Sequence, residues 1–145
     1  MPEVSTEAGF SLVELMIALA VAAIIAAFAI PSYQDHLQRS FLPEASSGLQ
    51  LSALRLEQYY QDRRSYLDDR GCGVVLPAPR RFIFNCIAAA DGQSFLLTAT
   101  GVEQDTMRGF TFTLDQQGNA STTALPDGWG AAPQPCWVTR RGGGC

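Results

Sequence analysis

Residues 9–32 read GFSLVELMIALAVAAIIAAFAIPS, and this stretch decides the fold of the N-terminal part of the chain. From Phe10 to Ile30 it contains no Gly or Pro and one charged residue, Glu14. A helix rises about 1.5 Å per residue, so this segment is just long enough to cross the ~30 Å hydrocarbon core of a bilayer. Gly9 precedes the apolar run, whereas a secretory signal peptide is cut after its apolar run. Cleavage at Gly9 would therefore leave the apolar helix on the mature protein.

Pro31 either ends this helix or kinks a longer one, because proline removes one helical hydrogen bond. The following sequence favours the longer helix, since apolar residues recur there at steps of three and four. They are Leu37, Phe41, Ala45, Leu49, Ala53, Leu56 and Tyr60. The polar residues between them predict a solvated face: Asp35, Gln38, Arg39, Glu44, Arg55, Glu57 and Gln58. We expect the amphipathic helix to end near Asp62, with Pro43 and Gly48 weakening it locally.

The second half of the chain carries strand patterns separated by turn residues. Residues 63–80 show no sustained period and predict a connecting loop. Strands are expected at residues 81–88, 94–100, 109–114 and, more weakly, 119–124. Their hairpin spacing predicts an α+β fold, in which an antiparallel meander of about four strands covers the apolar stripe of the long helix. The remaining tail, rich in Gly and Pro, is predicted to be a loop pinned to the sheet.

The composition fits one modest domain. The 145 residues carry a formal charge of −4, and every basic residue other than His36 is an arginine. This balance gives no overall signature of nucleic-acid binding, although local basic patches are compatible with it. The four cysteines all lie beyond residue 70, which is typical of an exported domain whose disulfides form outside the cytoplasm.

The N-terminal motif resembles that of type IV prepilins, the subunits of pili and of secretion pseudopili. The residues that carry the resemblance are GFSLVELMIALA, Pro31 and SYQDHLQRS. Later segments are similar to minor pilins of the PilE kind, namely LRLEQYYQDRRSY, GFTFTLDQQGN and CWVTRRGGGC. The resemblance implies the type IV pilin fold with a disulfide-closed C-terminal loop. It divides the chain into a cleaved leader (1–9), a transmembrane and filament-core helix (10–31), an amphipathic continuation (32–62), a connecting loop (63–80) and a sheet with the C-terminal loop (81–145).

The same resemblance implies roles for four residues. A prepilin peptidase would cut after Gly9 and N-methylate the new terminus at Phe10. Glu14 matches the carboxylate that guides assembly by pairing with the terminal amine of a neighbouring subunit, and Pro31 matches the proline near which the helix kinks. A carboxylate at this depth costs about 2.5–3.5 kcal/mol on insertion scales, so such charges are usually paired and functional. The alternative is a Glu14 side chain that reaches back to the membrane interface.

Four cysteines allow three pairings. We favour Cys72–Cys86, which would join the connecting loop to the first long strand, and Cys136–Cys145, which would close the C-terminal loop. In pilins, a disulfide at the second position closes a surface loop often involved in subunit contacts or binding. A four-cysteine zinc site is the competing hypothesis, but the spacing contains no closely spaced pair of the kind that zinc sites use.

Catalysis has little support in the sequence, and no cofactor or metal is predicted. The single His36 lies just past Pro31, and no nucleophile and base signature is present. Asp68-Asp69 and Glu103-x-Asp105 could suggest calcium, but neither has EF-hand spacing. Solvated loop acids are the simpler interpretation.

The C-terminal loop offers one binding hypothesis. Arg140 and Arg141 lie near Trp137 in a glycine-rich segment, and arginines beside an aromatic ring can contact DNA backbone and bases. Arg80-Arg81 could extend such a patch.

The sequence therefore predicts a structural subunit of a type IV pilus and not an enzyme. We expect a minor pilin that takes part in pilus assembly and hence in twitching motility, adhesion or DNA uptake. The alternatives are a major pilin, a type II secretion pseudopilin and a DNA-binding minor pilin for transformation. The expected partners are other pilins, through a bundle of N-terminal helices, the prepilin peptidase and the inner-membrane assembly platform. The protein would cross the inner membrane once, with a periplasmic C-terminal domain, before it enters the pilus.

Overall fold

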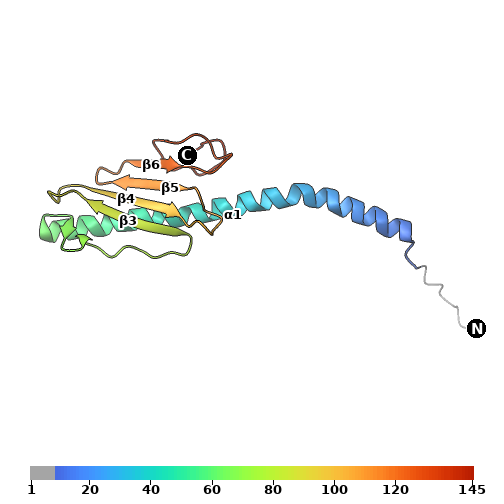
Figure 1. The fold of residues 1–145 in the computed structure, drawn as a ribbon, viewed down its shortest axis with the longest axis horizontal. Helices are drawn as coiled ribbons and strands as arrows, with labels where there is room; N and C mark the ends of the chain where they lie inside the picture. The colour runs from blue at the N-terminus through green and yellow to red at the C-terminus, as the bar shows by residue number, and fades with distance from the viewer. Residues whose placement is uncertain (1–8) are drawn as a thin grey trace, which may run out of the picture. The chain divides into compact units, whose positions relative to one another are not determined.

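The computed structural model describes residues 9–145, with only the backbone described at Pro31 and Ser32. Except for Gly9, the predicted leader lies outside the described residues. The described chain contains one helix, α1 (Leu12–Arg63), and two antiparallel sheets (Figure 1). It divides into two compact units, with the boundary between Leu37 and Gln38.

Helix α1 continues through Pro31 and ends one residue beyond the predicted Asp62. The next residue, Arg64, has a left-handed backbone with φ of 56°. Its N–H donates to the carbonyl of Tyr60 at 2.8 Å. A left-handed residue that satisfies one of the last helical carbonyls is a common way for a helix to end.

The second unit, residues 38–145, contains the predicted antiparallel meander. The spatial order of its strands follows the sequence: β3 (Phe82–Ala88), β4 (Phe95–Gly101), β5 (Thr111–Asp115) and β6 (Ala120–Ala124). Along β3, Phe82 and Phe84 are buried whereas Ile83 is exposed, because neighbouring side chains in a strand point to opposite faces. Leu97 pairs with Cys86 on one side and Leu114 on the other, which continues the buried face across the sheet.

The segment predicted to be a connecting loop, residues 63–80, contains a short hairpin. Strands β1 (Leu67–Asp68) and β2 (Gly71–Cys72) pair antiparallel. Gly71 has φ of 117°, which an L side chain rarely adopts. Two-residue strands give no periodic signal, so sequence patterning could not detect this hairpin.

The side chains of α1 that pack on the sheet include residues of the predicted apolar stripe and additional residues beside it. Ala45, Leu49 and Leu56 are fully buried, as the stripe predicts. Leu42 and Ser52 are also buried, although the sequence did not identify them. The Ser52 hydroxyl donates to the carbonyl of Gly48 at 2.7 Å, so its burial leaves no unsatisfied donor.

At Gly48, α1 lies directly against the ring of Phe84. A Cβ atom at this position would overlap the aromatic ring of Phe84 on β3. The sequence suggested that Gly48 only weakens the helix, but the structure gives it a packing role, because the ring fills the space that a side chain would need.

A cluster of aromatic rings closes the other end of the helix–sheet contact. Tyr66 stacks on Tyr60, with ring centroids 4.6 Å apart, and meets the edge of Phe95 at 4.9 Å. The Tyr66 hydroxyl donates to Glu57 at 2.7 Å. Burial, then the hydrogen bond to Glu57 and the charges of Glu57 and Tyr60, raise the pKa of Tyr66 to about 12.

Asp115 organises the turn between β5 and β6. Its carboxylate accepts hydrogen bonds from the backbone N–H groups of Gln117 and Asn119, both at 2.9 Å, and from the Asn119 side chain at 2.8 Å. Burial by itself would raise the pKa of Asp115, but these hydrogen bonds to the ionised form outweigh it and lower the pKa below its ordinary value.

We expect Gly48→Ala to lower the free energy of unfolding by about 1–2 kcal/mol, because overpacking against Phe84 exceeds the gain in helix propensity. Thermal unfolding of the full chain in detergent micelles measures the effect. Gln50→Ala, at an exposed position of the same helix, should change stability little. Phe84→Leu should be less harmful in the Gly48→Ala background than in the wild type. Equal stability of Gly48→Ala and the wild type would contradict the packing role.

One of the four tyrosines should ionise only near pH 12, and Tyr66→Phe should remove that step from a spectrophotometric titration. The raised pKa favours the protonated hydroxyl in the folded state. Its stabilisation is therefore complete below pH 10 and is lost as the pH rises through 12. At neutral pH, Tyr66→Phe should cost about 1 kcal/mol of stability. Titration of all four tyrosines near pH 10 would disprove the buried interaction.

Candidate functional site

The N-terminal unit exposes a continuous apolar surface. Every residue from Gly9 to Ile30 is exposed. The large apolar side chains among them are Phe10, Leu12, Val13, Leu15, Met16, Ile17, Leu19, Val21, Ile24, Ile25, Phe28 and Ile30. The mean hydropathy of this region reaches 2.7, and α1 is long and apolar enough to cross a membrane by length and composition. A helix that is apolar all round is stable in lipid or among other helices.

The predicted processing and assembly residues lie at the start of this helix. Gly9, Phe10 and Ser11 precede α1 and are exposed, so the predicted cleavage point is in a non-helical segment. Glu14 is the acidic residue of the first helical turn and is also exposed. The partial positive charge of a helix N-terminus favours a carboxylate at this position. The backbone at Pro31 is helical, and its predicted role as a hinge stays a prediction.

In the C-terminal unit, both disulfides join the cysteines that the sequence favoured. Cys72–Cys86 links β2 to β3, and Cys136–Cys145 closes the C-terminal loop. The Cα atoms are 6.0 Å apart in each pair, which is within the usual range for a disulfide.

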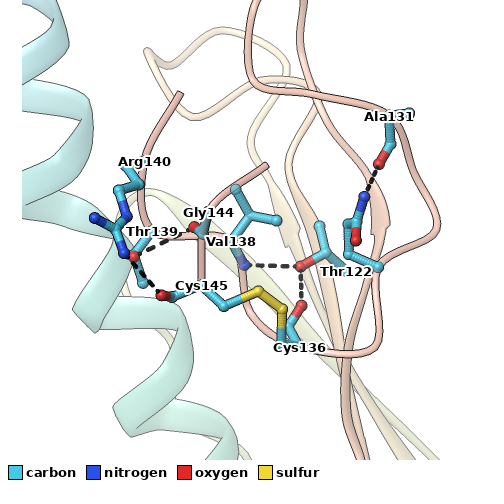
Figure 2. The surroundings of a disulfide bond; sticks show 9 residues. Thr122, Ala131, Cys136, Val138, Thr139, Arg140, Gly144 and Cys145 are labelled. Atoms are coloured by element: carbon cyan, nitrogen blue, oxygen red, sulfur yellow. Dashed lines mark hydrogen bonds between the residues drawn. A yellow bond between two sulfur atoms is a disulfide. The ribbon is translucent and has the colours of Figure 1, made fainter. Parts of the chain in front are cut away.

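One buried hydroxyl fixes the C-terminal loop to the sheet. Thr122 of β6 is fully buried, and its hydroxyl donates to the carbonyl of Cys136 at 2.7 Å and accepts the N–H of Val138 at 3.0 Å (Figure 2). The Thr122 backbone also forms a two-way bridge with Gln134, with both hydrogen bonds at 2.9 Å. The strand pattern around Thr122 was the weakest in the sequence, so this anchor could not be identified there.

A second anchor joins the loop to the helix. Trp129 is almost fully buried and meets the edge of Phe110, with ring centroids 4.8 Å apart. Its indole N–H donates to the side-chain oxygen of Gln38 at 3.3 Å, while the amide nitrogen of Gln38 donates to the carbonyl of Thr106 at 3.1 Å. The sequence placed Gln38 on a solvated face. The structure corrects this, because Gln38 is half-buried and links α1 to two loops.

Trp137 forms the wall of a pocket beside the loop. It is half-buried, and its indole N–H donates to the carbonyl of Thr113 at 3.0 Å. The pocket has a volume of about 260 Å³. Its other lining residues come from α1, β5 and the loop: Arg39, Leu42, Pro43, Ser46, Phe112, Val138 and Thr139.

The two arginines predicted to bind DNA are both exposed in the disulfide-closed loop. Arg140 reaches back to the backbone oxygen of Cys145 at 3.5 Å (Figure 2). The guanidinium carbon of Arg141 lies 5.9 Å from the ring of Trp129, at the outer limit of a cation–π contact. The backbone around the two arginines is held by hydrogen bonds from Arg140 N–H to the carbonyl of Gly144 and from Gly142 N–H to the carbonyl of Gly128, both at 3.3 Å.

Arg80-Arg81 does not extend this patch. Both residues precede β3, at the opposite edge of the sheet from β6 and the C-terminal loop. The guanidinium of Arg81 stacks over the ring of Phe41 at 3.5 Å, and the Arg81 backbone N–H donates to Glu44 at 3.3 Å. The sequence could not show that the two arginine pairs lie at opposite edges of the four-stranded sheet.

Two of the four acidic residues considered for calcium, Asp68 and Asp105, have structural partners. Asp68 accepts the backbone N–H of Arg70 at 2.8 Å, and Asp105 accepts the hydroxyl of Thr106 at 2.9 Å and the N–H of Met107 at 3.2 Å. Within residues 9–145, no group of three His, Cys, Asp or Glu side chains is arranged to hold a metal ion.

Comparison with known proteins identifies the family. Residues 31–124 match the family described as "Type IV minor pilin ComP, DNA uptake sequence receptor", and residues 4–30 match the "Prokaryotic N-terminal methylation motif". The first match covers well over half of the chain, and the chain therefore belongs to the type IV pilin family. The fold class expected from the sequence, a long helix on an antiparallel sheet, is confirmed.

Several individual relatives are fimbrial proteins. The chain is 35% identical over 95 residues to the fimbrial protein EcpC of Eikenella corrodens, covering 63% of this chain and 61% of the relative. It is 36% identical over 70 residues to the type IV major pilin PilE1 of Neisseria gonorrhoeae, covering 48% and 33%. It is 43% identical over 61 residues to the type IV major fimbrial protein FimA of Dichelobacter nodosus, covering 40% and 36%. The chain thus spans less than two thirds of the length of each of these relatives.

Among solved structures, this chain is similar to a type IV pilin from Shewanella oneidensis, with a TM-score of 0.43 and 22% identity. The alignment covers 60% of this chain and 89% of the Shewanella chain.

Removing the second disulfide should loosen the loop and leave the sheet intact. We expect Cys136→Ser/Cys145→Ser to lower stability by about 2–3 kcal/mol in the chain-entropy estimate. Because Thr122 and Gln38 still anchor the preceding residues, faster hydrogen exchange should be confined to residues 139–145. Cys72→Ser/Cys86→Ser is the matched control and should affect β2 and β3 instead. Faster exchange throughout β4 and β5 in the first variant would contradict the local role.

Proposed function

We propose that this protein is a minor pilin that enters a type IV pilus and binds DNA at its surface. The match of residues 31–124 to the family described as a DNA uptake sequence receptor is the observation that carries the proposal. The match ends at Ala124, so the contribution of the C-terminal loop rests on its own chemistry.

In this proposal, the chain first crosses the inner membrane once, with residues 38–145 in the periplasm. Both disulfides are compatible with that oxidising compartment. The prepilin peptidase cuts after Gly9, in the non-helical segment, and methylates the amine of Phe10. The methylation-motif match over residues 4–30 supports this processing.

Assembly then replaces lipid by other pilin helices around the apolar segment. Glu14 would be costly in this environment without a partner. The amine of Phe10 in a neighbouring subunit can neutralise it, and such a pair would fix the register between subunits. A backbone change near Pro31 would let the helix adjust to its neighbours, since proline removes one hydrogen bond there. The other expected partners are the major and minor pilins of the filament and the inner-membrane assembly platform, and the filament could serve adhesion or twitching motility as well as DNA uptake.

DNA would be held through local charge. Residues 38–145 contain all ten arginines and ten of the fourteen Asp and Glu residues, since Glu3, Glu7, Glu14 and Asp35 precede them, so the unit is formally neutral. Binding therefore depends on where the arginines lie. Arg140 and Arg141 are exposed in a loop fixed by Thr122 and the Cys136–Cys145 disulfide, and a fixed loop loses little conformational entropy when it contacts phosphates. Trp137 precedes them in the same loop and is half-buried.

The names of the relatives support a second candidate function, that of a major pilin. Both PilE1 and FimA are named as major subunits. The abundance of the protein in sheared filaments distinguishes the two, because a major pilin makes up most of the filament mass.

DNA binding can be tested with Arg140→Ala/Arg141→Ala in the full chain, purified in detergent. Loss of two phosphate contacts should weaken binding and reduce the slope of log affinity against log salt by about 2. The matched control is Arg63→Ala/Arg70→Ala, which removes the same charge from two exposed positions at the hairpin end of the unit. Fluorescence anisotropy with labelled duplex DNA over a salt series measures both. Equal losses in the two variants, or none in the first, would rule out the loop as the contact.

A further inference from the structure

A groove runs between α1 and the segment that joins β2 to β3. Its volume is about 370 Å³. The lining residues come from the helix, from this segment and from β3: Glu44, Ser47, Gly48, Leu51, Pro77, Pro79 and Phe84. The only ionisable residue among them is Glu44, and its carboxylate already accepts the N–H of Arg81. Most of the lining is therefore apolar, and the groove lies beside β3, at the edge of the sheet away from the C-terminal loop.

The groove is built into the fold. Ser47 and Gly48 are small, and the ring of Phe84 lies over Gly48 and forms part of the floor. Pro77 and Pro79 form the opposite wall and have fixed φ angles, which limits the ways in which the wall could collapse onto the helix. The wall is tied to α1, because the Arg55 guanidinium donates to the carbonyl of Val75 at 3.3 Å.

Large apolar side chains stand exposed beside this groove. Leu51 lines it and is 43% exposed, and Leu54, one helical turn further, is 57% exposed. Val75, on the segment that forms the opposite wall, is 80% exposed. The predicted apolar stripe of α1 does not include Leu51 or Leu54, and neither belongs to the core cluster under the sheet. Apolar side chains gathered around a groove are typical of a surface that binds a partner.

The chain itself supplies a segment of matching chemistry. All residues from Gly9 to Ile30 are exposed, and no charged residue occurs between Leu15 and Gln34. Once this helix leaves lipid, its side chains need an apolar surface contributed by other subunits. A groove with a leucine rim, in which Glu44 is the one ionisable lining residue, can receive such side chains, whereas DNA would meet a carboxylate and no cationic lining residue there.

We propose that this groove, with Leu51, Leu54 and Val75 at its rim, receives large apolar side chains from the N-terminal helix of a second pilin subunit. The inference rests on the proposed incorporation into a filament and adds the surface that the neighbour contacts. The apolar helix of one subunit thus packs on the outer side of α1 in another, while the inner side of that α1 packs on its own sheet.

Site-specific photocrosslinking tests the contact. A benzoylphenylalanine at position 51 of the full chain, expressed in its host, should give a crosslinked product in sheared filaments after irradiation. Mass spectrometry should map the partner peptide to residues 10–30 of a pilin subunit. The same probe at Ile83, which is 63% exposed on the outer face of β3, is the matched control and should give at least fivefold less of this product.

A second pair of variants tests whether the groove is needed for incorporation into filaments. Leu51→Glu/Leu54→Glu should reduce the amount of the protein in sheared filaments at least tenfold, while Ile83→Glu should leave it near the wild-type level. Both variants should keep their disulfides and their cellular level, which non-reducing electrophoresis and immunoblotting report.

The outcomes separate the two proposals. If the wild-type protein enters filaments but position 51 crosslinks only to other globular residues, the groove assignment is wrong and the pilin function stands. The same conclusion follows if Leu51→Glu/Leu54→Glu is incorporated normally. Wild-type protein that never enters filaments would overturn both.

Discussion

The close approach of α1 to the sheet at Gly48 is the constraint on which the C-terminal unit depends. The ring of Phe84 occupies the place of a side chain, and the helix can therefore lie close to β3. Because the helix lies close to the sheet, the side chains of Ala45, Leu49 and Leu56 are fully buried. The same small residues leave an open groove on the other side of the contact, lined by Pro77 and Pro79. The contact between Gly48 and Phe84 thus contributes both to the core and to the proposed docking surface.

The C-terminal loop depends on polar contacts of a different kind. Trp129 and Val138 are its buried apolar residues, and the glycines and prolines around them add little apolar surface. The buried hydroxyl of Thr122 and the amide of Gln38 add to that packing, and each satisfies two groups from distant parts of the chain. The Cys136–Cys145 disulfide then limits the freedom of the last residues. In the proposed function, this fixation holds Arg140 and Arg141 ready for a phosphate backbone.

The two proposed surfaces lie at opposite edges of the sheet, with β3 beside the groove and β6 beside the loop. A pilin that binds both a neighbouring subunit and DNA needs such a separation, because a surface buried in the filament cannot contact a ligand outside it. The formal neutrality of residues 38–145 fits this division, since only the local position of the arginines can favour DNA.

The sequence by itself determined the long helix, the four strands and the family. Each of these depends on information within one segment. Continuous hydrophobicity and apolar residues at steps of three and four predict the helix, alternation of apolar and polar residues predicts the strands, and the motif around Gly9 and Glu14 indicates the family. The two disulfide pairs favoured from the sequence are the ones that the structure joins. Only the tertiary structure decided the packing role of Gly48, the anchors at Thr122 and Gln38, and the separation of Arg80-Arg81 from Arg140-Arg141. The short β1–β2 hairpin belongs with these, because two residues per strand carry no period. Each of these features consists of contacts between residues far apart in the chain, and no local pattern records which distant group a side chain will meet.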